Sequence, residues 1–131
     1  VLWARKPSEI DNAFLAMSKE RAEALNVIGS ISLLKHLDRI RDLAAKNRLP
    51  SIFYHSTYVE RGGLMSYSAN IRDEWRRTAR IIDMILKGAN PADLPVEQAT
   101  KFELVVNLKT AKQLGITIPP SILYRADKVI K

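Results

Sequence analysis

The chain has 131 residues, which is enough for one domain with one hydrophobic core. Its 47% hydrophobic and 27% charged residues are ordinary for a globular protein. Cysteine is absent, which excludes disulfides and thiolate chemistry. The net charge of +7 would suit an anionic partner, but the basic residues are spread over several predicted helices. We therefore interpret the charge as a solvated basic surface.

The first third of the chain predicts a helix, a strand and a second helix. The first helix covers about 8–22, with Ser8 and Asp11 spaced like a capping box. A short apolar run at 24–28 predicts a strand that ends in Gly29-Ser30-Ile31-Ser32. The second helix is expected to turn a set of apolar residues inward. These are Leu33, Leu34, Leu37, Ile40, Leu43 and Ala44.

The middle of the chain predicts two strands and a long helix. Residues 52–54 form one strand, 57–61 a single helical turn, and 64–67 another strand. Gly62-Gly63 suits a positive φ or a close approach of the backbone to another group. Asn70 is expected to cap a helix that Gly88 ends. Its inward face is predicted to contain Ile71, Trp75, Ala79, Ile82, and Ile85 or Leu86.

The last third begins with a connector at 90–100 that contains two prolines. A strand follows at 102–106, then a helix at 108–114 that Asn107 caps and Gly115 ends. A last helix is predicted from about Ser121, with Ile122, Leu123, Ala126, Val129 and Ile130 on its inner face. Because strands alternate with helices, we predict a three-layer α/β domain whose mainly parallel sheet carries helices on both faces.

Ligands of such sheets bind at the loops that follow the carboxyl ends of the strands. The candidate ligand-binding residues are therefore small, hydroxyl-bearing or aromatic residues of these loops and of the glycine pair. They are Gly29, Ser30, Ser32, Tyr54, His55, Ser56 and Gly63. Alternatives remain for several of them, because either serine could simply cap the next helix and Tyr54 could pack in the core.

The sequence lacks the motifs of common catalytic and cofactor sites. HExxH, GxxxxGK, GxGxxG and GxSxG are all absent. His55 and Ser56 are adjacent, and neighbours on an extended chain point to opposite faces, so they do not form a nucleophile–base pair. No group of carboxylates and histidines has the spacing of metal ligands. We therefore expect neither an enzyme nor a cofactor or metal.

Four blocks of sequence carry a resemblance to a known family. They lie at 62–67 (Gly-Gly-Leu-Met-Ser-Tyr), 85–98, 101–112 and 114–121. In this order they resemble the carboxyl-terminal part of ABC-transporter substrate-binding proteins that are grouped with tryptophan- and tyrosine-uptake proteins. The resemblance covers nearly the whole chain and is looser over residues 1–24.

The resemblance implies one lobe of a type I periplasmic-binding fold, with residues 1–131 as a single domain. It implies that a missing amino-terminal lobe forms the other wall of the ligand cleft. A small-molecule ligand and an ABC permease would be the partners, and the protein would lie in the periplasm or be lipid-anchored outside the cytoplasmic membrane. Better-known members often have an aspartate or asparagine at the position of Ser30 or Ile31 and an aspartate at the position of His55. Because these are absent here, we expect an aromatic or carboxylate-bearing ligand without a cationic amine.

Two other functions remain open. A free-standing regulatory or interaction domain could be built from the same lobe, with a homodimer covering its exposed cleft face. Nucleic-acid binding through the arginines of residues 72–80 is the weaker alternative, because acidic residues partly offset them. We therefore expect no nucleic-acid partner.

Overall fold

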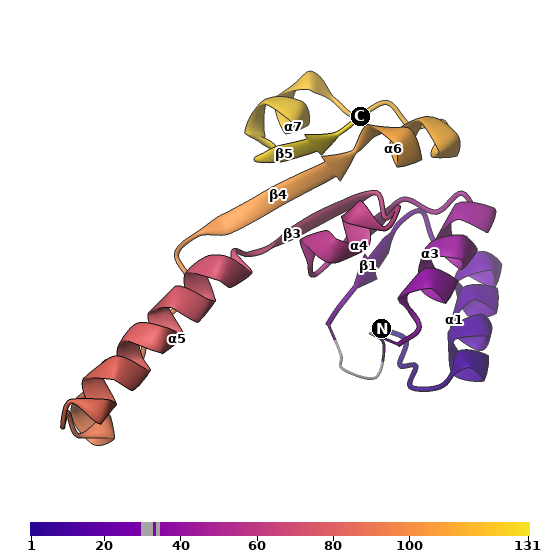
Figure 1. Cartoon of the computed structure of the whole chain (residues 1–131). Helices are drawn as coiled ribbons and strands as arrows, with labels where there is room; N and C mark the ends of the chain where they lie inside the picture. The colour runs from indigo at the N-terminus through magenta and orange to yellow at the C-terminus, as the bar shows by residue number, and fades with distance from the viewer. Residues whose placement is uncertain (30–32, 34) are drawn as a thin grey trace.

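A single mixed sheet organises the chain (Figure 1). The structure is a computed structural model that describes residues 1–29, 33 and 35–131. Within these residues the strands lie side by side in chain order. They are β1 (Leu25–Val27), β2 (Ser51–Phe53), β3 (Met65–Ala69), β4 (Phe102–Asn107) and β5 (Lys128–Ile130). Neighbouring strands are parallel, except that β3 and β4 are antiparallel.

Helices cover both faces of this sheet, which confirms the predicted α/β class. The helices of the described residues, in chain order, are α1 (Pro7–Lys19), α3 (Leu37–Lys46), α4 (Ser56–Glu60), α5 (Ile71–Leu86), a 3-10 turn (Pro91–Asp93), α6 (Leu108–Leu114) and α7 (Pro120–Arg125). Val27 and Phe53 are paired in register and pack with α1 and α3 in one core cluster. Val106 belongs to a second cluster with α6 and α7. Because side chains alternate along strands, the register puts the two clusters on opposite faces.

Most predicted elements are confirmed, but both ends of the chain differ from the prediction. The Ser8–Asp11 capping box is wrong: α1 begins at Pro7, and the Glu9 carboxylate accepts the backbone N–H of Arg5 at 2.6 Å. Asp11 instead accepts from Arg39 Nε of α3 at 3.0 Å. A proline at the first helical position starts the helix without a serine cap.

The predicted last helix is too long. It ends at Arg125, and residues 128–130 form β5 beside β4. The Asp127 N–H donates to the Leu104 carbonyl, and the Leu104 N–H donates to Asp127 Oδ2 at 2.8 Å. These two bonds place the start of β5 beside β4, and Val129 then pairs with Val106.

The largest correction concerns α5. Asn70 caps it as predicted, by accepting the Asp73 N–H at 3.1 Å, but its predicted inward face is not buried. Trp75 is 67% exposed and Leu86 81%, and none of the described residues of α5 is buried. Helix α5 and the segment that returns to β4 project away from the sheet (Figure 1). We call residues 70–101 the α5 arm, and the rest of the described chain the sheet body.

Ion pairs hold the returning segment of the α5 arm to its helix. Arg77 Nε donates to Asp73 within α5 at 3.0 Å. Its Nη1 donates to the carbonyl of Gln98 in the returning segment. Arg80 pairs with Glu97 at 2.6 Å. The polar side of α5 is therefore occupied by its own return segment, whereas its apolar stripe has no partner among the described residues.

Candidate functional site

The carboxyl ends of β1 and β2 lie at the same end of the sheet, because the two strands are parallel neighbours. We call this end, where β1, β2 and β3 finish, the carboxyl edge. The loops that follow them touch: a Cβ built on Gly29 would lie 2.6 Å from Cδ2 of Tyr54. Only glycine lets the backbone come so close to that ring. Ser30 and Ser32, which follow Gly29, lie outside the described residues. The structure thus brings the loops after β1 and β2 together at Gly29 and Tyr54.

Tyr54 is held by Tyr58 of α4. The Tyr58 hydroxyl donates to the Tyr54 hydroxyl, and the two rings meet edge to face with centroids 4.9 Å apart. Burial, together with this hydrogen bond, raises the pKa of Tyr58, so it remains a neutral donor. Tyr54 is only partly buried, and because its oxygen already accepts, its own proton can be donated elsewhere.

His55 and Ser56 start α4. His55 Nδ1 accepts the Thr57 N–H at 3.2 Å, so the neutral imidazole carries its proton on Nε2. Both residues line a cavity of about 230 Å³ at the carboxyl edge of the sheet. The other lining residues come from α4, the β3–α5 junction, β4 and β5. They are Glu60, Ala69, Asn70, Ile71, Arg72, Glu103, Val105 and Lys128.

The cavity contains a fixed ion pair. Lys128 Nζ lies 2.7 Å from Glu60 Oε1 and joins α4 to β5. This hydrogen bond and the charge of Lys128 lower the pKa of the Glu60 carboxyl, and the nearby positive charge of Arg72 adds to the effect. Glu60 therefore stays ionised at neutral pH. Such a site can hydrogen-bond and charge-pair a small polar ligand.

Gly63 lies away from this cavity. It precedes β3, at the edge opposite to His55, and the reason for a glycine there is packing. A Cβ on Gly63 would come within 2.8 Å of the Phe53 ring and 2.9 Å of the Tyr58 carbonyl oxygen. The predicted close approach of the glycine pair is thus found, but it involves the protein's own core.

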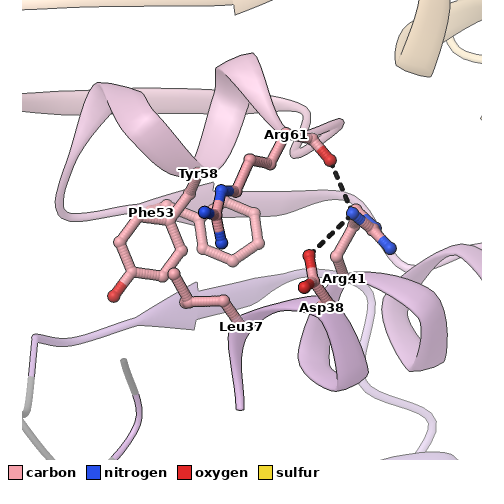
Figure 2. Close-up of a pocket in the computed structure, with 6 residues that line it drawn as sticks. All are labelled: Leu37, Asp38, Arg41, Phe53, Tyr58 and Arg61. Carbon is pink, nitrogen blue, oxygen red and sulfur yellow. Dashed lines mark hydrogen bonds and ion pairs between the residues drawn. The ribbon is translucent and has the colours of Figure 1, made fainter. Parts of the chain in front are cut away.

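A crevice between α3 and α4 is a packing seam (Figure 2). The rings of Phe53 and Tyr58 stack there with centroids 5.2 Å apart. Arg41 donates to Asp38 at 2.9 Å and to the Arg61 carbonyl at 2.7 Å. The crevice leaves no space for a water-sized molecule, so it offers no binding site.

Sequence reasoning missed the residues that the far strands bring to the cavity. Because β4 runs antiparallel to β3, its first residues return to the edge where β3 ends, and Glu103 lies there. Lys128 was predicted in a helix, whereas it begins β5 and pairs with Val105. The signal for this strand is the pair of hydrogen bonds between Asp127 and Leu104, which join distant parts of the chain and are not visible in the sequence.

Solved structures share this architecture. One is a conserved domain protein from Vibrio cholerae, with a TM-score of 0.86 and 28% identity over 96% of this chain and 42% of that one. Another is an ABC domain in complex with L-Trp from Streptococcus pneumonia, with a TM-score of 0.84 and 32% identity over 94% and 41%. The ligand-free, open structure of CD0873, an adhesive substrate-binding protein from Clostridium difficile, has a TM-score of 0.64 at 22% identity over 93% and 41%. These are folds of the periplasmic-binding-protein type, and the chain shares that class.

The family model of the ABC transporter substrate binding proteins matches residues 2–130, and the chain belongs to that family. The family is a non-enzymatic component of transport. Among curated proteins, none matches the chain. The chain spans about 42% of the length of the solved structures to which it is similar.

Two negative findings apply to residues 1–29, 33 and 35–131. No helix there is long and apolar enough to cross a membrane. In the same residues, no three histidine or acidic side chains gather closely enough to hold a metal ion.

Proposed function

We propose that this chain is the ligand-binding lobe of a solute-binding protein that serves an ABC uptake transporter. A small ligand would bind at the carboxyl edge of the sheet, where the loops after β1 and β2 meet. The observation that carries the proposal has two parts: the loops after β1 and β2 meet where Gly29 lies against Tyr54, and His55 and Ser56, which follow Tyr54, line a cavity of about 230 Å³. Family membership supports the same role.

We propose that a second lobe covers this edge and that residues 1–131 are one domain of a two-lobed protein. The α5 arm supports this proposal, because it leaves the sheet where β3 ends, at the edge that carries the cavity. The Asn70 N–H donates to the Lys101 carbonyl at 2.9 Å, which joins the outgoing and returning strands at the base of the arm. Its exposed apolar stripe, from Ile71 to Leu86, would then pack on that lobe.

The proposed ligand is aromatic or carboxylate-bearing. Tyr54, which is only partly buried, offers the exposed part of its ring and a hydroxyl, and His55 and Ser56 offer donors to an anionic group. The related ABC domain in complex with L-Trp is consistent with an aromatic ligand. In the complete protein, lobes that close on the ligand would form the surface that a membrane permease recognises, outside the cytoplasmic membrane.

A thermal-shift screen of the full-length protein against amino acids, aromatic acids and nucleosides tests the proposal. A ligand that binds only the folded form raises Tm, by an amount that grows with its concentration. Tyr54→Ala and His55→Ala should reduce the shift, whereas Tyr124→Ala, at a tyrosine 94% exposed on α7, should not. Unchanged shifts in both site variants would remove these residues from the site.

The exposed apolar stripe of α5 also supports a second candidate, a homodimer of a free-standing interaction domain. Here the stripe, with Trp75 at its centre, would pack against a second copy of the chain. The mass of the natural protein in solution distinguishes the two candidates. A monomer containing an upstream α/β lobe favours the binding protein, and a dimer of the short chain favours the interaction domain.

A further inference from the structure

The cavity at the carboxyl edge contains a guanidinium that is not among the candidate residues predicted from the sequence. Arg72 lies in the first turn of α5 and lines the cavity together with His55 and Ser56. Arg77 and Arg80, further along α5, pair with acidic residues of the arm. Among the described residues, Arg72 has no ion pair. Among the arginines of α5, Arg72 is therefore the one that lines the cavity and has no ion pair with a described residue.

The acidic groups of the cavity do not neutralise Arg72 directly. Glu60 is engaged by Lys128 at 2.7 Å. Glu103, at the start of β4, forms no ion pair within the described residues, and it lines the same cavity. Glu60 and Glu103 outweigh Lys128 by one negative charge, so the groups around Arg72 supply no attraction to an anion of their own. A ligand carboxylate would therefore need direct contact with Arg72.

We propose that Arg72 is a ligand-binding residue and that it receives the carboxylate of the bound solute, with His55 as a second donor. This inference rests on the proposed function and narrows its ligand to a carboxylate-bearing one. A guanidinium forms paired, charge-assisted hydrogen bonds to a carboxylate, and it remains charged at any physiological pH. His55 contributes the Nε2 proton, since its Nδ1 is bound to the Thr57 N–H.

The test compares each acid with its own amide, which keeps the shape and removes the charge. The probes are benzoate, phenylacetate and succinate beside benzamide, phenylacetamide and succinamide, measured by thermal shift and titration calorimetry on the full-length protein. We expect at least one acid to bind and its amide to bind at least about tenfold more weakly. Arg72→Gln should weaken that acid by a similar factor and leave its amide unchanged.

Arg76→Gln is the matched control, because it removes the same charge one turn along α5, from a residue outside the cavity lining. It should leave the affinity for the acid within about twofold. Glu103→Gln removes a negative charge from the cavity and should tighten the same acid.

Three results would overturn the inference: equal binding of acid and amide, full affinity in Arg72→Gln, or equal losses in Arg72→Gln and Arg76→Gln. These outcomes are distinct from failure of the proposed function. If nucleosides or other neutral solutes raise Tm while no acid does, the binding function stands and the role of Arg72 falls. If no solute of any class raises Tm, both fall.

Discussion

The sheet body and the α5 arm contain similar apolar side chains but bury them to different extents. In the sheet body, Phe53 and Val106 are essentially inaccessible to solvent. In the α5 arm, Trp75 and Leu86 are mostly exposed, although the helix has the periodicity of an amphipathic one. The arm is held together by ion pairs such as Arg80–Glu97, and the body by packing.

This difference indicates that the two regions depend on different partners. The body buries its core among its own elements, so its stability should belong to the chain itself. The helix of the arm is capped by Asn70 and has ion pairs to its own return segment. Its apolar stripe, however, would be stabilised only by a surface that the described residues do not provide. Substitutions in matched pairs, one in each region, test this interpretation.

Phe53→Ala and Trp75→Ala should show the largest difference in their effect on the free energy of unfolding. Removing the Phe53 ring, which is 1% exposed and stacked on Tyr58, should lower the free energy of unfolding by about 3–5 kcal/mol. Trp75→Ala should cost the isolated chain less than about 0.5 kcal/mol. Urea unfolding followed by circular dichroism measures both.

The same pair also reports on the arm's partner. In the full-length protein, Trp75→Ala should become clearly destabilising if a second lobe covers the stripe. A large cost of Trp75→Ala in the isolated, monomeric chain would contradict the description of the arm as unpartnered.

Asn107→Ala paired with Asn70→Ala compares two helix caps. Asn107 accepts the Thr110 N–H at 3.1 Å, and its Nδ2 donates to the buried Val59 carbonyl at 3.0 Å. Its loss should therefore cost about 2 kcal/mol or more, since a cap is removed and a buried carbonyl is left unpaired. Asn70 caps α5 only, so Asn70→Ala should cost about 1 kcal/mol.

The two cap variants should also differ in where the protein opens, which amide hydrogen exchange can locate. Asn70→Ala should speed exchange in the first turns of α5 alone, whereas Asn107→Ala should affect β4 and α6 as well. Identical exchange patterns would mean that the arm and the body unfold as one unit.

Glu60→Gln should have the smallest effect. The pKa of Glu60 lies below its usual value near 4.5, so its pairing with Lys128 stabilises the folded state above that pH, and this contribution is lost as the pH falls through the folded pKa. Both side chains are about half exposed, which limits the effect to a few tenths of a kcal/mol at neutral pH. The difference from the wild type should shrink in acid and at high salt, and a difference independent of pH would exclude the ion pair as its cause.

The candidate site could be predicted from sequence only in part. Tyr54 ends a recognisable strand and His55 and Ser56 follow it, so their place at a carboxyl edge follows from local pattern and the parallel-sheet rule. The sequence groups Gly63 with them because a glycine pair has several uses, and it does not show that the Phe53 ring lies against Gly63. Arg72 and Lys128 reach the cavity through the pairing of β3, β4 and β5, which no local pattern encodes.

Sequence alone determined the elements whose boundaries are local. Asn70, Asn107 and Gly115 fix helix ends through their own hydrogen bonds or a positive φ, so the residues suffice to predict them. Only the tertiary structure decided what each apolar face meets. The same periodicity is buried in α3 and exposed in α5, and 128–130 became a strand because β4 offered an open edge, since burial and strand pairing depend on residues far away in the chain.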